Sequence, residues 1–178
     1  MGVTEKLDDV PPGTDRLAFR EWNDDDLDRF HAICSDPQVM KFVGDGQAWS
    51  RDRTGRFIHS AKEMFREHGY CQWALIHKVD GELIGYCGFV NSDDAPEIGW
   101  RLAPEYWGKG LATEAARAVL KHGIETLGFQ RVIATVQAAN VASIRIIEKL
   151  GMTQVERFDR DGREVLVYSA DAGRLTSG

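Results

Sequence analysis

Cysteine and clustered histidine are scarce in this chain of 178 residues. The three cysteines, Cys34, Cys71 and Cys87, are odd in number and form no Cys-x-x-Cys pair. We therefore do not expect a disulfide framework, and this cysteine content is more typical of a protein in a reducing compartment than in an oxidising one. The five histidines are scattered without the spacing of metal ligands, so no metal site is expected either.

Long hydrophobic runs and an excess of positive charge are also missing. No apolar run approaches the ~20 residues that span a bilayer. Residues 1–13 are polar, contain Pro11 and Pro12, and do not resemble a signal peptide. With 22 Lys and Arg against 28 Asp and Glu, the net charge is −6, which does not suit binding to nucleic acid or anionic lipid. We therefore expect a soluble, cytoplasmic protein with no nucleic-acid or membrane partner.

What the chain does contain is enough apolar material for one ordinary domain. Hydrophobic residues make up 43% of the sequence, and the 28% of charged residues is near the globular average. No repeat, low-complexity tract or interdomain linker is visible. We expect a flexible lead-in at residues 1–13, a single domain at residues 14–170, and a tail at residues 171–178.

Hydrophobic periodicity predicts alternating helices and strands. Asn23, Ser50 and Asn140 are expected to cap three helices, and a further amphipathic helix runs from Leu111 to Leu127. The Asp24–Asp26 run is interpreted as the solvated start of the first helix. Strands are expected at residues 17–21, 72–79, 83–90, 97–102, 131–136, 152–159 and 164–169. This order predicts a mixed α/β (α+β) sheet packed by helices on both faces.

The segment Trp107-Gly108-Lys109-Gly110-Leu111-Ala112 lies between a strand and this amphipathic helix. The first N–H groups of a helix lack internal partners and carry partial positive charge, so a phosphate is favoured there. Glycines allow close backbone approach, and Lys109 adds a mobile positive charge. The simpler reading is a tight turn before a surface helix. The glycine spacing does not fit a P-loop, and Thr113 replaces the third glycine of a dinucleotide-binding fingerprint.

A second motif covers residues 140–152, where Asn140 opens a short helix that closes with Lys-Leu-Gly-Met. Together and in this order, the two motifs resemble the GCN5-related N-acetyltransferase (GNAT) superfamily, and most of all its ribosomal-protein alanine N-acetyltransferase-like branch. The family's pyrophosphate motif, Gln/Arg-x-x-Gly-x-Gly/Ala, is matched except at Trp107. The resemblance covers roughly residues 14–170.

The resemblance implies a mostly antiparallel central sheet in which two parallel strands, residues 97–102 and 131–136, splay apart to form a groove for acetyl-CoA. Gly99 would suit a bulge, a close backbone approach or simple packing. The first two helices and the loop between them would wall the acceptor site, so residues 42–50 are expected to contact substrate. The expected donor-binding residues are Trp100, Leu102, Trp107, Gly108, Lys109, Gly110, Leu111, Ala112, Thr113 and Asn140.

The acceptor amine must be neutral to attack the thioester. A lysine-like amine with a pKa of ~10.4 is neutral in roughly 1 part in 2,500 at pH 7, a cost of about 4.6 kcal/mol, whereas an α-amine near ~7.8 costs about 1 kcal/mol. Glu97, which opens the strand leading to the glycine turn, is the candidate general base, directly or through water. A solvated edge-strand carboxylate is the alternative. Glu114 is interpreted as serving the helix dipole.

The departing thiolate needs a proton. Many family members supply it from a tyrosine in the later helix, but Ile147 stands at that position. In the branch that this chain resembles, a serine three residues after the asparagine takes the role, which implies Ser143. A hydroxyl that only bonds backbone in the first helical turn is the alternative.

The sequence therefore predicts an N-acetyltransferase that transfers an acetyl group directly from acetyl-CoA to a primary amine of a protein N-terminus or a small molecule. Its oligomeric state, monomer or homodimer, stays open. A non-catalytic acyl-CoA-binding domain is the alternative, because the tyrosine is replaced. A nucleotide-binding oxidoreductase is disfavoured by Thr113.

Overall fold

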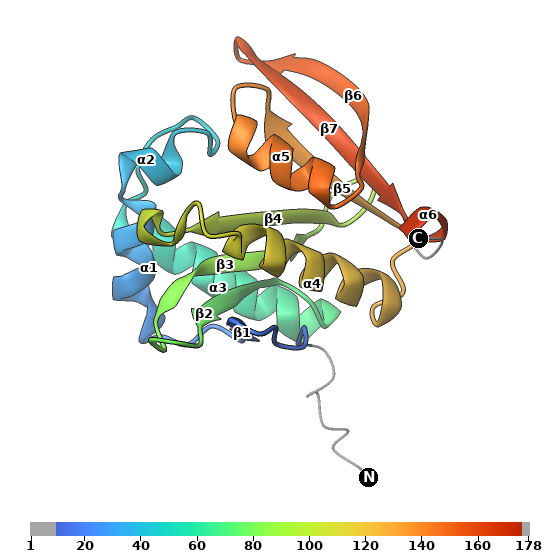
Figure 1. Ribbon diagram of the computed structural model, residues 1–178. Helices are drawn as coiled ribbons and strands as arrows, with labels where there is room; N and C mark the ends of the chain where they lie inside the picture. The colour runs from blue at the N-terminus through green and yellow to red at the C-terminus, as the bar shows by residue number, and fades with distance from the viewer. Residues whose placement is uncertain (1–9, 176–178) are drawn as a thin grey trace.

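The computed structural model describes residues 10–175 and contains one sheet in the strand order β1-β2-β3-β4-β5-β7-β6 (Figure 1). Every neighbouring pair is antiparallel except β4 and β5, which are parallel. The mostly antiparallel sheet expected from the sequence is thus confirmed. Its strands are β1 (Leu17–Arg20), β2 (Gln72–His77), β3 (Leu83–Val90), β4 (Glu97–Leu102), β5 (Arg131–Gln137), β6 (Thr153–Arg160) and β7 (Arg163–Asp171).

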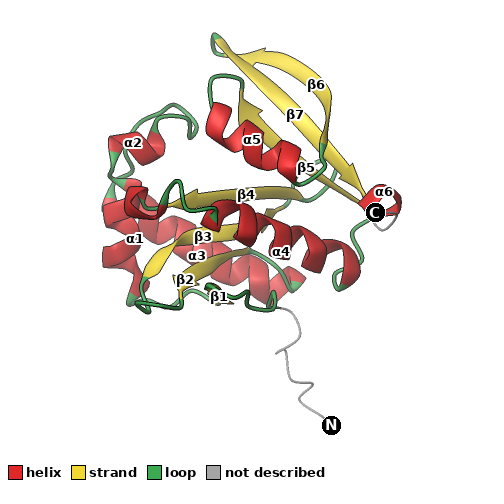
Figure 2. Ribbon diagram, viewed as in Figure 1, coloured by secondary structure: helices red, strands yellow, loops and turns green. Residues whose placement is uncertain are grey.

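Helices cover both faces of the sheet, as Figure 2 shows. One face carries α1 (Asp26–Cys34) and α3 (Arg51–His68), which pack on each other. The other carries α4 (Leu111–Glu125), which packs on β3 and β4, and α5 (Val141–Lys149), which packs on α4 and β5. Between the layers lies an apolar core in which Phe30, Trp73 and Phe89 are completely buried. No helix within residues 10–175 is long and apolar enough to cross a membrane.

Local signals explain most helix ends. The Ser50 side chain accepts a hydrogen bond from the Arg53 N–H at 3.2 Å and begins α3, and Gly69 ends that helix with a left-handed φ of 76°. The Asn140 side chain caps α5 by accepting a hydrogen bond from the Ser143 N–H, also at 3.2 Å. Both caps were predicted from the sequence and are confirmed.

The predicted cap at Asn23 is wrong. Helix α1 begins at Asp26, and the Asn23 backbone N–H donates to the Asp26 carboxylate at 2.9 Å. Asp26 is also only 6% exposed, with its two oxygens bonded to the Arg20 guanidinium at 2.7 and 2.8 Å. The interpretation of residues 24–26 as solvated therefore holds for Asp24 and Asp25 but not for Asp26, because a buried carboxylate is retained where a cation pairs with it.

Short elements were missed at the connections. Pro37 begins α2 (Pro37–Met40), which Asp36 caps by accepting a hydrogen bond from the Gln38 N–H. A 3₁₀ turn, η2 (Pro104–Tyr106), precedes the glycine-rich segment. Strand β2 ends at His77, two residues before the predicted end, and Val79 is 82% exposed.

The predicted lead-in and tail lie partly outside the residues that the structure describes. Residues 1–9 of the predicted lead-in and residues 176–178 of the predicted tail are outside the described residues. Within the predicted tail, β7 continues to Asp171 and is followed by the short helix α6 (Ala172–Leu175).

Candidate active site

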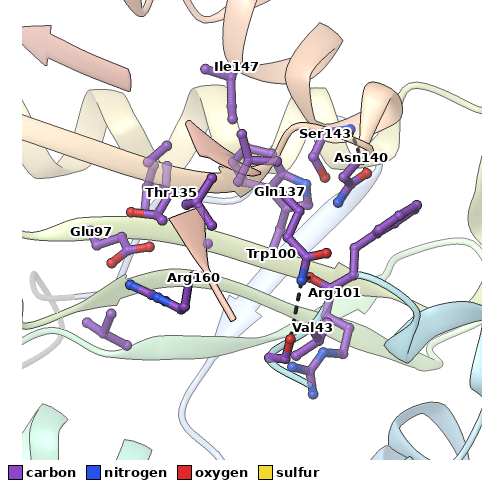
Figure 3. Close-up of a pocket in the computed structure, with 18 of the residues that line it drawn as sticks. Val43, Glu97, Trp100, Arg101, Thr135, Gln137, Asn140, Ser143, Ile147 and Arg160 are labelled. Atoms are coloured by element: carbon purple, nitrogen blue, oxygen red, sulfur yellow. Dashed lines mark hydrogen bonds between the residues drawn. The ribbon is translucent and has the colours of Figure 1, made fainter. Parts of the chain in front are cut away.

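Strands β4 and β5 are paired at one point only, where Glu97 faces Ile133 and the Ile133 N–H donates to the Pro96 carbonyl at 3.0 Å. Beyond that point they separate, while β5 stays paired along its length with β7. The separation leaves the backbone groups of β4 on that side without a strand partner. A cavity of about 510 Å³ opens along this gap, lined by β4, β5, the start of α5, residues 42–45 and the β6–β7 turn (Figure 3).

Four of the predicted site residues line this cavity: Glu97, Trp100, Asn140 and Ser143. Residues far apart in the sequence thus share one space, with Glu97 on one side and α5 on the other (Figure 3). The other predicted residues, Leu102 and residues 107–113, do not line it. Leu102 is the last residue of β4, and residues 107–113 form the turn into α4 and the first three residues of that helix.

Glu97 is a partly buried carboxylate held by β5. The hydroxyl and backbone N–H of Thr135 both donate hydrogen bonds to it. Burial nevertheless raises the pKa of Glu97 above its ordinary value, against the opposing effects of the Thr135 bonds and of the Arg160 charge. Figure 3 shows the Arg160 side chain directed toward Glu97. A carboxylate whose affinity for protons is raised and which faces a cavity is suited to accept one.

The first turn of α5 forms another wall. Ser143 lies there because Asn140 caps the helix, and both side chains reach the cavity (Figure 3). Ile147 lies one turn further along, is 1% exposed, and lines the same cavity. The position where the resemblance expects a tyrosine therefore does face the cavity, but it carries an aliphatic side chain.

The turn before α4 has the geometry of an anion site. Gly108 and Gly110 have left-handed φ angles of 69° and 77°. Gly110 precedes the first helical residue, and no side chain caps the helix. The N–H groups of its first turn are therefore left for another acceptor.

Two side chains of this turn are held by backbone. The Trp107 ring N–H donates to the Leu102 carbonyl at 2.8 Å, and Trp107 as a residue is 45% exposed. The Lys109 ammonium, expected as a mobile charge, donates to the Glu105 carbonyl at 2.8 Å and lies over the Tyr106 ring.

Sequence reasoning missed the partners that hold the turn from outside. The Arg16 guanidinium donates to the Lys109 carbonyl at 2.9 Å and to the Glu114 carboxylate at 2.7 Å. Thr14 also donates to Glu114, at 2.6 Å. These bonds hold the pKa of Glu114 below its ordinary value against desolvation. Glu114 thus ties the segment before β1 to α4 rather than serving the helix dipole alone.

Of the loop expected to contact substrate, residues 42–50, residues 42–45 line the cavity and residues 46–50 do not. The loop is fastened to the opposite wall by two side chains. Gln137 of β5 donates to the carbonyls of Phe42 and Gly44, both at 3.2 Å. Arg163 of β7 donates to the carbonyls of Gly44 and Asp45 at 3.1 and 3.0 Å.

Comparison with known proteins shows the family of this chain. Residues 16–153 match the acetyltransferase (GNAT) domain. The chain belongs to the GNAT acetyltransferase family. The N-acetyltransferase p20 of Bacillus licheniformis is 31% identical over 165 residues, which are 91% of this chain and 89% of p20.

Other GNAT proteins extend the likeness. A GNAT-family acetyltransferase structure from Bacillus anthracis superposes with a TM-score of 0.81 at 27% identity, covering 92% of this chain and 99% of that one. Spermidine N(1)-acetyltransferase of Escherichia coli K12 is 25% identical over 80% of this chain and 75% of its own length. This GNAT chain therefore shares its fold with the Bacillus anthracis acetyltransferase over nearly the whole length of both chains.

Proposed function

We propose that the protein is an N-acetyltransferase that transfers the acetyl group of acetyl-CoA directly to a primary amine. The observation that carries the proposal is the cavity between the separated strands β4 and β5. It brings a carboxylate with a raised pKa, Glu97, and a hydroxyl, Ser143, to facing walls of one space.

The residues present fit the donor molecule. The uncapped N-terminus of α4 would hold the diphosphate on the N–H groups of residues 108–113. The free edge of β4 at Trp100 and Leu102 would bond the amides of the pantetheine arm as a strand would, and Asn140 would contact it near α5. Bound there, acetyl-CoA supplies an activated thioester.

Glu97 would take the proton of the incoming ammonium group, directly or through water. This step matters most for a lysine-like amine, whose neutralisation costs about 4.6 kcal/mol at pH 7, and least for an α-amine, at about 1 kcal/mol. Burial of Glu97 supports the role because it raises the pKa of the base toward that of the acid it must deprotonate. Ser143 would donate a proton to the departing thiolate in place of the tyrosine that Ile147 replaces.

The acceptor is either a protein N-terminus, as the resemblance to the ribosomal-protein branch suggests, or a small amine. Ile147 keeps a second candidate open, a domain of the same fold that binds acyl-CoA without turning it over.

One experiment separates these functions. Coenzyme A is titrated into the pure protein by calorimetry, and thiol release from acetyl-CoA is measured with a panel of amines, with acetylated product detected by mass. Binding with amine-dependent release supports the enzyme. Binding without release for any amine supports the non-catalytic domain. Absence of binding at millimolar coenzyme A contradicts both.

A further inference from the structure

We propose that Arg101 forms an anion subsite for the acceptor, and that the acceptor is a small molecule carrying both a primary amine and a carboxylate. The proposal rests on the proposed acetyltransferase function and goes further by naming the substrate class. It starts from a charged residue that the sequence analysis did not single out, although Arg101 is visible in the sequence between Trp100 and Leu102.

Arg101 is a buried cation without a carboxylate partner. It is 6% exposed, lines the cavity, and forms no ion pair with any acidic residue among those described. One guanidinium nitrogen donates to the Cys34 thiol at 3.1 Å. The guanidinium also lies 4.3 Å from the Trp49 ring centroid and 5.4 Å from that of Tyr86. The Nε–H has no hydrogen-bond partner within the described part of the chain.

Such an arrangement is costly in the ligand-free protein. A guanidinium stays charged at any physiological pH, and a buried charge is normally paired. Stacking on Trp49 and Tyr86 offsets part of the cost, but aromatic faces supply no acceptor for the Nε–H. The thiol of Cys34 is a weak acceptor, and burial raises its pKa, so it is neutral beside Arg101. The missing counter-charge is thus best supplied by a ligand in the cavity.

The position of Arg101 relates it to the reaction. Glu97, Gly99 and Arg101 alternate along β4 and so project to the same face of the sheet, and Arg101 is in register with Tyr86 of β3. Four residues of a strand span about 13 Å. Between them, a Cβ added at Gly99 would meet only the Gln72 amide, at 4.0 Å, so this stretch of the face is open. An acceptor a few bonds long would fit there, with its amine toward Glu97 and its carboxylate on Arg101.

The charges around the cavity favour the same class. Its acidic lining residues are balanced in number by arginines, and Arg160 already faces Glu97 (Figure 3). A polyamine, which carries only positive charges, would place a cation against Arg101 at high desolvation cost. An amino carboxylate would instead pair with charges of both signs. The lining charges are Asp45, Glu97 and Asp161 against Arg101, Arg160 and Arg163.

The test uses matched acceptors. β-Alanine and γ-aminobutyrate are compared with their amides, and glycylglycine with glycylglycinamide, by kcat/KM for thiol release from acetyl-CoA. Each pair has a primary amine at the same position and nearly the same size. The amide has the less basic amine because it lacks the nearby negative charge, which favours the amide, so a preference for the acid is due to the carboxylate. We expect the acid to be favoured by about tenfold or more, the value of a hydrogen bond to a charged group.

Two variants and one control locate the effect. Arg101→Gln should bring the acid-to-amide ratio close to unity, mainly through KM, and Arg101→Lys should keep part of it. Arg53→Gln is the control, because the Arg53 guanidinium lies over the same Trp49 ring, 4.8 Å from its centroid, but Arg53 is exposed and does not line the cavity. Its ratio should equal that of the wild type.

The outcomes separate the two proposals. If amides or spermidine are acetylated as well as the acids, or if Arg101→Gln keeps the ratio, the subsite is wrong and the acetyltransferase function stands. If coenzyme A binds but no amine is acetylated, both fail. If circular dichroism and the melting curve show that Arg101→Gln does not fold, the acid-to-amide ratios of the wild type and of Arg101→Lys still test the subsite.

Discussion

Replacement of Gly110 by alanine tests the phosphate turn on which donor binding depends. Gly110 has a φ of 77°, and an added Cβ would meet only the Arg16 guanidinium, at an ordinary 3.6 Å. Gly128, beyond the other end of the same helix, has a φ of 73° and no atom within 4 Å of an added Cβ. Gly128→Ala is therefore a matched control, with the same backbone strain but at the end opposite the turn.

The two variants should lose similar stability. A left-handed conformation costs an L-residue roughly 1–2 kcal/mol, and the lower entropy of the unfolded chain returns about 0.4–1 kcal/mol. The net loss of about 1 kcal/mol lowers Tm by about 2–4 °C for a domain of this size.

Their affinities for coenzyme A should differ sharply. If the phosphates rest on the N–H groups of the α4 turn, a methyl group at Gly110 displaces at least one charge-assisted hydrogen bond. Such a bond is worth about 1.5–3 kcal/mol, which corresponds to a loss of about 10-fold to 150-fold in Kd. Gly128→Ala should leave Kd unchanged.

Calorimetric titration of coenzyme A into wild type and both variants measures this difference, with melting curves run alongside. Equal affinity of the two variants would refute the placement of the diphosphate at residues 108–113. A loss of affinity in Gly128→Ala alone would refute it as well.

Three further variants probe the base, the acid and a structural ion pair. Glu97→Gln should slow turnover and, at pH values above 7, should have a higher Tm than the wild type. Burial raises the pKa of Glu97, so the stability of the wild type falls as pH rises through that pKa. A higher Tm of the variant that persists at pH values below the ordinary carboxyl pKa would contradict this. Ser143→Ala should lower kcat about a hundredfold with Kd for coenzyme A unchanged, whereas unaltered kcat in a thiol-release assay would remove Ser143 from the mechanism. Asp26→Ala should lower the free energy of unfolding in urea by about 2–3 kcal/mol. This is less than is usual for breaking a buried ion pair, because the Arg20 side chain is 37% exposed. Its control is Asp24→Ala, whose side chain is 94% exposed and paired with Lys62, and which should cost under about 1 kcal/mol; equal losses would show that the Arg20 pair is not the cause.

Much of the fold could be predicted because its signals are local. The cap at Asn140, the cap at Ser50 and the glycine turn before α4 depend on hydrogen bonds or φ angles within a few residues, which side-chain type alone largely dictates. The cap predicted at Asn23 was wrong because of another residue nearby. The Asp26 carboxylate accepts a hydrogen bond from the Asn23 N–H and pairs with Arg20. The motifs at residues 107–112 and 140–152 indicated the family because both are contiguous in sequence.

The site itself was only partly predictable. Glu97 was named from its place at the start of the strand that leads to the glycine turn, and Ser143 from the resemblance. The sequence did not show that they share a cavity, because that depends on β4 and β5 parting after a single pair. Arg16 against Glu114, and Arg163 against Gly44, join residues 98 and 119 positions apart. No local pattern marks such contacts.

The sequence by itself therefore determined the order of the long helices and strands, the caps at Ser50 and Asn140, and the motifs for the donor. Only the tertiary structure decided which side chains meet across the gap in the sheet, and that Arg101 is buried there without a carboxylate. The physical reason is that capping and periodicity are properties of neighbouring residues, whereas burial and charge pairing depend on what the rest of the chain brings alongside.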